Sequence, residues 1–261
     1  MYLGQHFLIN IDAIARIIST PKLEAGDLVV ELGPGTGALT YPLLEECKKA
    51  GATLVAIEKD RNLALKLYQS IQKKESSFEV RDKDLLKELP KLMEEKSPKR
   101  YHIVGNLPYY ISGKILRTIT DLQNKPETAV LMLQKEVAQR ICNKKKLSLI
   151  AASVQVWADT EIVMNLSEND FDPAPKVKSA VIKLTKKEKM PEVDQSYFDF
   201  LKASFKQPRK TLLNNLNQAG VEKQDAAKAL KALKFEENVR ASELTVEQLY
   251  ELSKKLKLVN K

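Results

Sequence analysis

Short apolar runs alternate with longer amphipathic stretches over the first two thirds of the chain. The runs LVVEL at residues 28–32 and TLVAIE at residues 53–58 have the length of strands, and helical patterns follow them at residues 39–50 and 61–74. Further strand candidates lie at residues 78–81, 101–104, 128–133, 150–157 and 177–184. Strands that alternate with helices predict βαβ units, so we expect an α/β fold with a mainly parallel sheet of about seven strands.

The pattern changes after residue 184. Residues 185–195, TKKEKMPEVDQ, are charged, contain a proline and lack periodicity, which is typical of a linker. Beyond them, apolar positions recur every three or four residues in four segments, at 197–205, 210–220, 226–235 and 245–258. Gly220 indicates a helix end and Thr245 a helix start. We predict an α/β domain at residues 1–187 and a small all-helical C-terminal domain at residues 188–261.

The composition limits the partners and cofactors. The 261 residues include 43 lysines and arginines against 34 acidic residues, which gives a formal net charge of +9. A basic excess favours a polyanionic partner such as nucleic acid, because each neutralised phosphate releases counterions. A solvated surface rich in lysine and glutamate is the alternative. Two cysteines and two histidines are too few to predict a metal centre or a disulfide framework, so we expect no metal.

Signals for export or membrane insertion are not found in the sequence. The N-terminus lacks the succession of basic, apolar and small residues of a signal peptide. No apolar run approaches the ~20 residues that span a bilayer. We therefore expect a cytoplasmic protein without membrane contact.

A glycine-rich motif follows the first predicted strand. GPGTGA at residues 33–38, with Gly33 and Gly35 as its first two glycines, matches the dinucleotide-binding pattern and opens a predicted helix. Glu58 closes the next strand about 20 residues later, where its carboxylate could accept hydrogen bonds from ribose hydroxyls. The motif predicts a site for an adenosine-containing cofactor. A tight turn that binds no ligand would also favour glycine.

Two further acidic residues refine this prediction. Glu31 stands at the carboxyl end of its strand, where it would repel a pyrophosphate and tolerate an ammonium and a sulfonium, so it favours S-adenosylmethionine over NAD. Capping of a neighbouring loop is the alternative for Glu31. Asp84 follows the third strand and could accept a hydrogen bond from an adenine amine. Asp82 competes for that role, and either carboxylate could instead be a helix N-cap.

The segment GNLPYYIS at residues 105–112 follows the fourth strand and is expected at the same edge of the sheet. The amine of adenine is a poor nucleophile because its lone pair is delocalised into the ring, so two acceptors must hold its hydrogens during methyl transfer. Asn106 offers a side-chain carbonyl, and Pro108 leaves the main-chain carbonyl of Leu107 free as the second acceptor. Tyr109 can stack on the base.

These four residues, 106–109, are the predicted catalytic segment, a clamp for a flipped-out base. A general base of unusual pKa is not needed, since the work is positioning and electrostatics. The alternative is a plain turn at the end of a strand, because asparagine, proline and glycine all favour turns.

Taken together, these motifs resemble the rRNA adenine dimethyltransferase family over nearly the whole chain. The segments that carry the resemblance are GQHFLIN at 4–10, ELGPGTGALT at 31–40, IEKD at 57–60, NLPYYIS at 106–112, MLQKEVAQRI at 132–141, FDPAPKVKSAVIKL at 171–184, FKQPRKTLLNNL at 205–216 and VRASELTVEQLYEL at 239–252. Their order along the chain is more specific than any single motif. The resemblance implies a Rossmann-like methyltransferase domain followed by a helical domain.

The resemblance also implies roles for individual residues. S-adenosylmethionine is the implied cofactor. The residues implied to lie against it are His6, Leu8, Gly33, Glu58, Asp84 and Asn106. Phe171 is implied to lie near the target base, although an aromatic residue before a proline-containing stretch also packs as core. We further predict that Lys176, Arg209 and Lys210 bind the RNA substrate.

The family has two main branches. One dimethylates two adjacent adenines in a 3′-terminal hairpin loop of small-subunit (16S) rRNA, and the other modifies a large-subunit adenine and confers macrolide resistance. Residues 171–184 and 205–216 look more like the small-subunit branch. We therefore expect a monomeric rRNA (adenine-N6,N6)-dimethyltransferase that acts on the immature 30S particle. A nicotinamide-dependent oxidoreductase and a non-catalytic assembly factor are the other hypotheses.

One segment departs from the family pattern. The loop at residues 142–153 is shorter than the family usually carries, and in the family it borders the substrate entrance. The resemblance therefore leaves the docking of RNA open. Lys144, Lys145 and Lys146 could supply phosphate contacts there, or could form a solvated turn.

Overall fold

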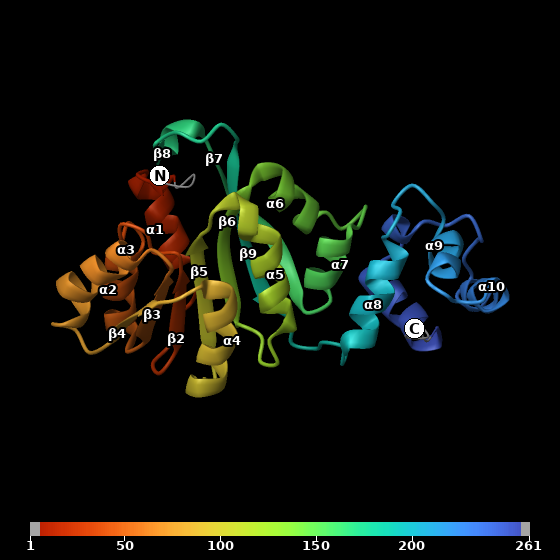
Figure 1. The fold of residues 1–261 in the computed structure, drawn as a ribbon, viewed down its shortest axis with the longest axis horizontal. Helices are drawn as coiled ribbons and strands as arrows, with labels where there is room; N and C mark the ends of the chain where they lie inside the picture. The colour runs from red at the N-terminus through yellow and green to blue at the C-terminus, as the bar shows by residue number, and fades with distance from the viewer. Residues whose placement is uncertain (1–5, 257–261) are drawn as a thin grey trace. The chain divides into compact units, whose positions relative to one another are not determined.

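The computed structural model describes residues 6–256 and contains a central seven-stranded sheet (Figure 1). Its strands are β2 (Leu28–Leu32), β3 (Thr53–Glu58), β4 (Phe78–Asp82), β5 (Tyr101–Asn106), β6 (Thr128–Gln134), β7 (Ala158–Leu166) and β9 (Ser179–Lys186). They lie in the order β4-β3-β2-β5-β6-β9-β7. The first five pair in parallel, and β9 pairs antiparallel with β6. The predicted α/β class with a mainly parallel sheet is confirmed.

The prediction of a strand at residues 150–157 is wrong. This segment forms helix α7 (Leu149–Gln155), whose N-cap Ser148 accepts a hydrogen bond from the Ala151 amide. A short apolar run cannot be assigned to strand or buried helix by its periodicity, and here the cap favours the helix. The seventh strand is β7, which follows directly. Its side chains at Asp159 and Glu161 are exposed, so it lacks the apolar run that marks the buried strands.

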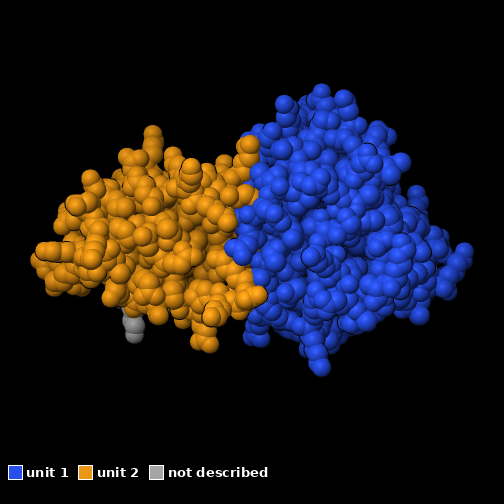
Figure 2. Space-filling model, turned by 180° about the vertical axis from the view of Figure 1, so that it is seen from behind, with its two compact units in different colours: residues 1–138, 159–186 blue, residues 139–158, 187–261 orange. Residues whose placement is uncertain are grey.

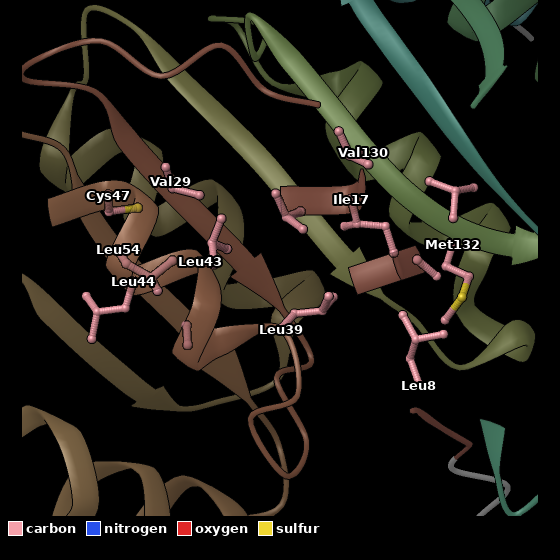
Figure 3. Packing of buried hydrophobic residues seen from close by; sticks show 14 of the residues in the cluster. Leu8, Ile17, Val29, Leu39, Leu43, Leu44, Cys47, Leu54, Val130 and Met132 are labelled. Atoms are coloured by element: carbon pink, nitrogen blue, oxygen red, sulfur yellow. The ribbon is translucent and has the colours of Figure 1, made fainter. Parts of the chain in front are cut away.

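Helices pack on both faces of the sheet. The helices of the first face are α1 (Ile11–Ser19), α2 (Thr40–Ala50) and α3 (Arg61–Leu67), with α3 continued by a π-helical turn η1 (Tyr68–Gln72). Figure 3 shows this face, where Leu43 of α2 lies near Val29 and Leu54 of the sheet and Ile17 of α1 lies near Val130, all in one buried cluster. The helices α4 (Leu85–Lys96) and α5 (Ser112–Asp121) contact each other, and α4 packs on β3. The sheet is thereby covered as a doubly wound fold requires.

A second, very small sheet anchors the first described residues. Strand β1 (Phe7–Leu8) pairs antiparallel with β8 (Phe171–Asp172), which follows the 3-10 turn η3 (Glu168–Asp170). Leu8 and Phe171 are both buried in the cluster of the first face. The N-terminal segment is therefore attached to a part of the chain that is distant in sequence.

The contacts divide the chain into two compact units (Figure 2). The α/β unit comprises residues 1–138 and 159–186, and the helical unit comprises residues 139–158 and 187–261. The helical unit contains α7, the end of α6 (Lys135–Cys142), α8 (Gln195–Ser204), α9 (Leu212–Gln218), α10 (Lys223–Ala232), η4 (Ala241–Glu243) and α11 (Val246–Lys255). The predicted domain boundary after residue 187 stays a prediction. The contacts place residues 139–158 with the tail, and Lys187 donates to the Gln155 carbonyl at 2.6 Å.

The four predicted tail helices are confirmed within the described residues; residues 257 and 258 of the last segment lie outside them. Thr245 is the N-cap of α11 and forms a capping box with Gln248. Gly220 follows α9 with φ +92°, a conformation that ends a helix readily only at glycine. Between residues 6 and 256, no helix is both long and apolar enough to cross a membrane.

Candidate active site

A cleft of about 740 Å³ opens at the carboxyl ends of β2 to β5. The neighbours β2 and β5 lie where the strand order reverses, which is the point where open α/β sheets bind ligands. The predicted cofactor and catalytic residues that line the cleft are His6, Leu8, Glu31, Gly33, Gly35, Glu58, Asp84, Asn106, Leu107, Pro108 and Tyr109. The structure therefore brings both predicted sets into one cleft. Residues 4 and 5 of the N-terminal motif lie outside the described residues.

The glycine loop presents its backbone to the cleft. Gly33, Gly35 and Gly37 have φ of +68°, +59° and +93°, values that other residues rarely adopt. A Cβ on Gly35 would come within 3.0 Å of the Phe7 ring, so the loop lies directly against β1. The Gly33 amide donates to the Ile57 carbonyl at 3.0 Å, which ties the loop to β3. A loop without side chains at these positions fits the close approach of a nucleoside-containing ligand.

Glu58 is held by the backbone on both sides. One carboxylate oxygen accepts from the Gly35 amide at 3.0 Å, and the other accepts from the Asp60 amide at 2.8 Å. The side chain is buried and lines the cleft. Each oxygen can accept a further hydrogen bond. This arrangement fits an acceptor for ribose hydroxyls, fixed in place before any ligand binds.

Glu31 is a buried acid with an unused acceptor. Only 1% of its surface is exposed, and its Oε2 has no hydrogen-bond partner among the described residues. Burial raises the pKa of Glu31 to about 8, and the nearby charge of Glu58 adds to the effect. This oxygen therefore does not cap a neighbouring loop, which was the alternative role for Glu31. A buried acceptor in the cleft wall fits a cationic ligand group.

Asp84 fills one of the two roles that the sequence leaves open, the N-cap of α4, and its contact with an adenine amine stays a prediction. Its Oδ1 accepts from the Leu86 amide at 3.0 Å and caps α4, while its Oδ2 pairs with Lys59 Nζ at 3.1 Å. The ion pair with Lys59 lowers the pKa of Asp84, so this carboxylate is charged. Asp82 does not line the cleft, and its Oδ2 lies 4.0 Å from Arg61 Nε. Of the two aspartates, Asp84 is the one that lines the cleft.

The predicted catalytic segment begins where β5 ends. Asn106 is the last residue of β5, and Tyr109 opens a 3-10 turn, η2 (Tyr109–Ile111), that leads into α5. The Asn106 Nδ2 donates to the main-chain carbonyl of His6 at 3.2 Å. The side-chain Oδ1 of Asn106 is the end of the amide that can accept a hydrogen bond from a substrate amine.

Tyr109 is anchored at both its ring and its hydroxyl. The ring lies roughly parallel to the His6 imidazole, with centroids 6.3 Å apart and planes at 22°. The hydroxyl shares a 2.5 Å hydrogen bond with Ser179 of β9. Burial raises the pKa of Tyr109, so the phenol stays protonated at neutral pH. A ring fixed in this way is suited to stack on a base.

Of the predicted substrate-binding residues, Tyr109 lines the cleft, and the other four, Phe171, Lys176, Arg209 and Lys210, do not. Phe171 is buried, with 4% exposed, and lies in the core cluster away from the cleft wall. Its side chain would have to leave the core to touch a base, so that contact stays a prediction. Lys176 is exposed between β8 and β9. Arg209 and Lys210 are exposed in the helical unit just before α9, and their contacts with RNA also stay predictions.

Some residues of the cleft were not identified from the sequence. Lys59 is one of them, although its place directly after Glu58 at a strand end could have indicated it. Phe7 is another lining residue, and Ser179 holds the Tyr109 hydroxyl from β9. Their roles depend on contacts with Gly35 and Tyr109 that no local pattern reveals. Residues 6–256 show no group of three histidine, cysteine or acidic side chains arranged to hold a metal ion.

The chain is similar to curated small-subunit rRNA methyltransferases. It is 38% identical over 253 residues to ribosomal RNA small subunit methyltransferase A of Mycoplasmopsis pulmonis, with 95% of each chain covered. It is 34% identical over 270 residues to the protein of that name from Lactobacillus helveticus, with 97% of this chain and 90% of the relative covered.

Two solved structures share the fold of this chain. A dimethyladenosine transferase from Plasmodium falciparum superposes with a TM-score of 0.80 at 25% identity, covering 97% of this chain and all of the other. The 23S rRNA methyltransferase ErmE superposes with a TM-score of 0.73 at 24% identity, covering 96% of this chain and 99% of the other. A family model matches residues 1–258, and the chain belongs to the ribosomal RNA adenine dimethylase family.

Proposed function

We propose that this protein is an S-adenosylmethionine-dependent dimethyltransferase for two adjacent adenines in a 3′-terminal hairpin loop of small-subunit rRNA. The observation that carries this proposal is the placement of Asn106 and Leu107 in one cleft with the glycine loop and Glu31. The relatives named small subunit methyltransferase A support the small-subunit rRNA over the large-subunit rRNA. The family supports a methyl donor over a nicotinamide nucleotide, and the buried Glu31 in the cleft wall agrees with a cationic ligand group.

The residues of the cleft fit S-adenosylmethionine, which when bound supplies an electrophilic methyl group. The left-handed glycines at 33 and 35 leave room for the ligand beside the backbone. Glu58 would accept from the ribose hydroxyls, and Asp84 from the adenine amine. Glu31 would face the cationic part of the donor, because its free Oε2 is buried in the cleft wall.

The residues that would hold the adenine act by positioning its amine. Asn106 Oδ1 and the Leu107 carbonyl would accept the two hydrogens of the exocyclic amine, which favours the tetrahedral nitrogen that attack requires. Tyr109 would support the plane of the base. A strong base is not needed, since the amine is neutral and its proton can leave to water afterwards. Fixed acceptors of this kind act by orientation and by preorganised electrostatics.

The same proposal extends to the particle that carries the rRNA substrate. We propose that the protein acts as a monomer in the cytoplasm on an immature 30S particle, in which the adenines are still accessible. The net charge of +9 supports a partner rich in phosphate. Arg209 and Lys210 on the helical unit, and Lys176 on the α/β unit, are exposed and available for such contacts.

A turnover assay tests this function. Small-subunit particles from a strain that lacks the modification are incubated with the protein and S-adenosylmethionine, and the rRNA nucleosides are analysed by mass spectrometry. The expected product is N6,N6-dimethyladenosine at two adjacent positions, absent with the variant Asn106→Ala. Binding without methylation would indicate a non-catalytic assembly factor, and methylation of large-subunit rRNA alone would indicate the other branch. Calorimetric binding of NAD without binding of S-adenosylhomocysteine would end the methyltransferase reading.

A further inference from the structure

The amide of Asn106 has two ends with opposite roles. Its Oδ1 can accept a hydrogen bond from an amine, whereas its Nδ2 can only donate. In the structure Nδ2 donates to the His6 carbonyl at 3.2 Å. If the amide were turned over, two acceptor oxygens would face each other there, and an NH₂ group would face the amine. The carbonyl of His6 therefore selects the orientation in which Asn106 can accept.

His6, whose carbonyl accepts this hydrogen bond, is held in place by two further contacts. The ladder between β1 and β8 continues through the Ile9 amide, which donates to the Asp170 carbonyl at 2.9 Å. The Nδ1 of the His6 ring lies 2.7 Å from the Pro173 carbonyl, an acceptor, so this nitrogen carries the proton and donates. Residue 6 is thereby fixed by its neighbours in the chain and by its own side chain.

A side-chain pair closes the far end of this short strand. Asn10 Nδ2 donates to Asp170 Oδ1 at 2.6 Å, while Asn10 Oδ1 accepts from the Ala13 amide at 3.0 Å and caps α1. The other oxygen of Asp170 accepts from the Ser167 amide at 2.6 Å and from its hydroxyl at 2.9 Å. The hydrogen bond from Asn10 is the main reason that the pKa of Asp170 is lowered. The pair therefore joins the start of α1 to the end of η3.

We propose that β1 is a positioning element for methyl transfer, in which the Asn10–Asp170 pair holds the His6 carbonyl so that Asn106 presents its oxygen to the amine. The proposal rests on the proposed function of the cleft. Asn10 and Asp170 act through His6 and touch neither substrate nor donor. Neither residue lines the cleft. Because β1 also contacts the glycine loop through Phe7, donor affinity is expected to respond, but less than turnover does.

Four variants separate positioning from folding. Asn10→Ser keeps an N-cap for α1 and removes the donor to Asp170. Asn10→Asp places two carboxylates where the 2.6 Å hydrogen bond was. Asp170→Asn also breaks the pair, because its NH₂ group must face either the NH₂ group of Asn10 or the donors of Ser167. The exchange Asn10→Asp with Asp170→Asn rebuilds it in reverse, because Asp at position 10 accepts from the new amide and still caps α1, while the new amide oxygen still accepts from Ser167.

Turnover and hydrogen exchange are measured on all four variants beside the wild-type protein. We expect kcat to fall about tenfold or more for Asn10→Ser and Asn10→Asp, since displacements of the order of 1 Å cost up to about 100-fold. Affinity for S-adenosylhomocysteine should change by less than about threefold, or about 0.7 kcal/mol. Exchange of the Ile9 amide should accelerate in both variants. The double variant, Asn10→Asp with Asp170→Asn, should restore both kcat and the protection of the Ile9 amide from hydrogen exchange.

A readout without substrate keeps this inference separate from the proposed function. In ¹⁵N-labelled protein the side-chain NH₂ resonances of Asn106 report its hydrogen bond to His6 directly. They should move towards solvent-exposed values in Asn10→Ser and return in the double exchange. Unchanged resonances, or full kcat in Asn10→Ser despite a loosened strand, would overturn the positioning role. An inactive wild-type protein with the expected resonance shifts would instead count against the proposed substrate and leave the orientation of the amide supported.

Discussion

Replacing Glu31 with glutamine is expected to remove a pH-dependent loss of stability and to weaken donor binding. Burial raises the pKa of Glu31 from 4.5 to about 8 in the folded protein. A raised folded pKa means that the contribution of this group to stability is intact below pH 4.5 and is lost as the pH rises through 8. At pH 7 the unfolded chain ionises this carboxyl while the fold keeps it protonated, which costs about 3 kcal/mol at about 1.4 kcal/mol per pH unit.

Urea unfolding from pH 5 to pH 8 measures this effect. The free energy of unfolding of Glu31→Gln relative to wild type should increase by about 3 kcal/mol across this range. Glu94→Gln, an exposed change on α4 away from the cleft, serves as the matched control and should show no such trend. At pH 8, calorimetry should show S-adenosylmethionine binding to Glu31→Gln weakened by about tenfold, or 1.4 kcal/mol. A stability difference that is flat with pH would refute the reasoning.

Three further changes probe the remaining parts of the cleft. Asn106→Ala should abolish methyl transfer while S-adenosylhomocysteine affinity, measured by calorimetry, falls by less than about tenfold; full activity would contradict its role. Tyr109→Ala should raise the KM for the RNA particle more than it changes donor affinity, because the ring supports the base and not the donor; an unchanged KM would argue against stacking. Gly35→Ala should destabilise the protein by about 1 to 2 kcal/mol in thermal unfolding, because its φ is +59° and its Cβ would meet Phe7 at 3.0 Å; an unchanged melting temperature would show that the loop can relax.

Most of the fold could be predicted from the local pattern of apolar and polar residues. The buried parallel strands are continuous apolar runs, so β2, β3 and β6 are found directly from the sequence. Residues 150–157 carry a similar run, and only the Ser148 cap distinguishes them as a helix. The exposed positions of β7 hide the strand that follows. Strand prediction therefore fails at one edge of the sheet, at β7, and succeeds at the other edge, at β4, and in the strands between.

The site could be predicted where it depends on strand ends. Glu31, Glu58, Asp84 and Asn106 each follow or close a predicted strand, and parallel strands bring such ends together. The contact of Asn106 with His6 joins residues 100 positions apart through a strand of two residues, which carries no periodicity. The burial of Phe171 likewise depends on its packing with Leu8. Long-range contacts of short segments are what the sequence alone does not reveal.

The central claim is that the amine of an adenine is held by Asn106 and Leu107 beside the donor. A crystal structure of the protein with S-adenosylhomocysteine and an RNA fragment that contains the two adjacent adenines measures this directly. We predict that the exocyclic nitrogen lies within about 3.2 Å of both Asn106 Oδ1 and the Leu107 carbonyl oxygen, with the base against Tyr109. An adenine bound elsewhere, with those two oxygens turned away from the sulfur of the ligand, would contradict the account.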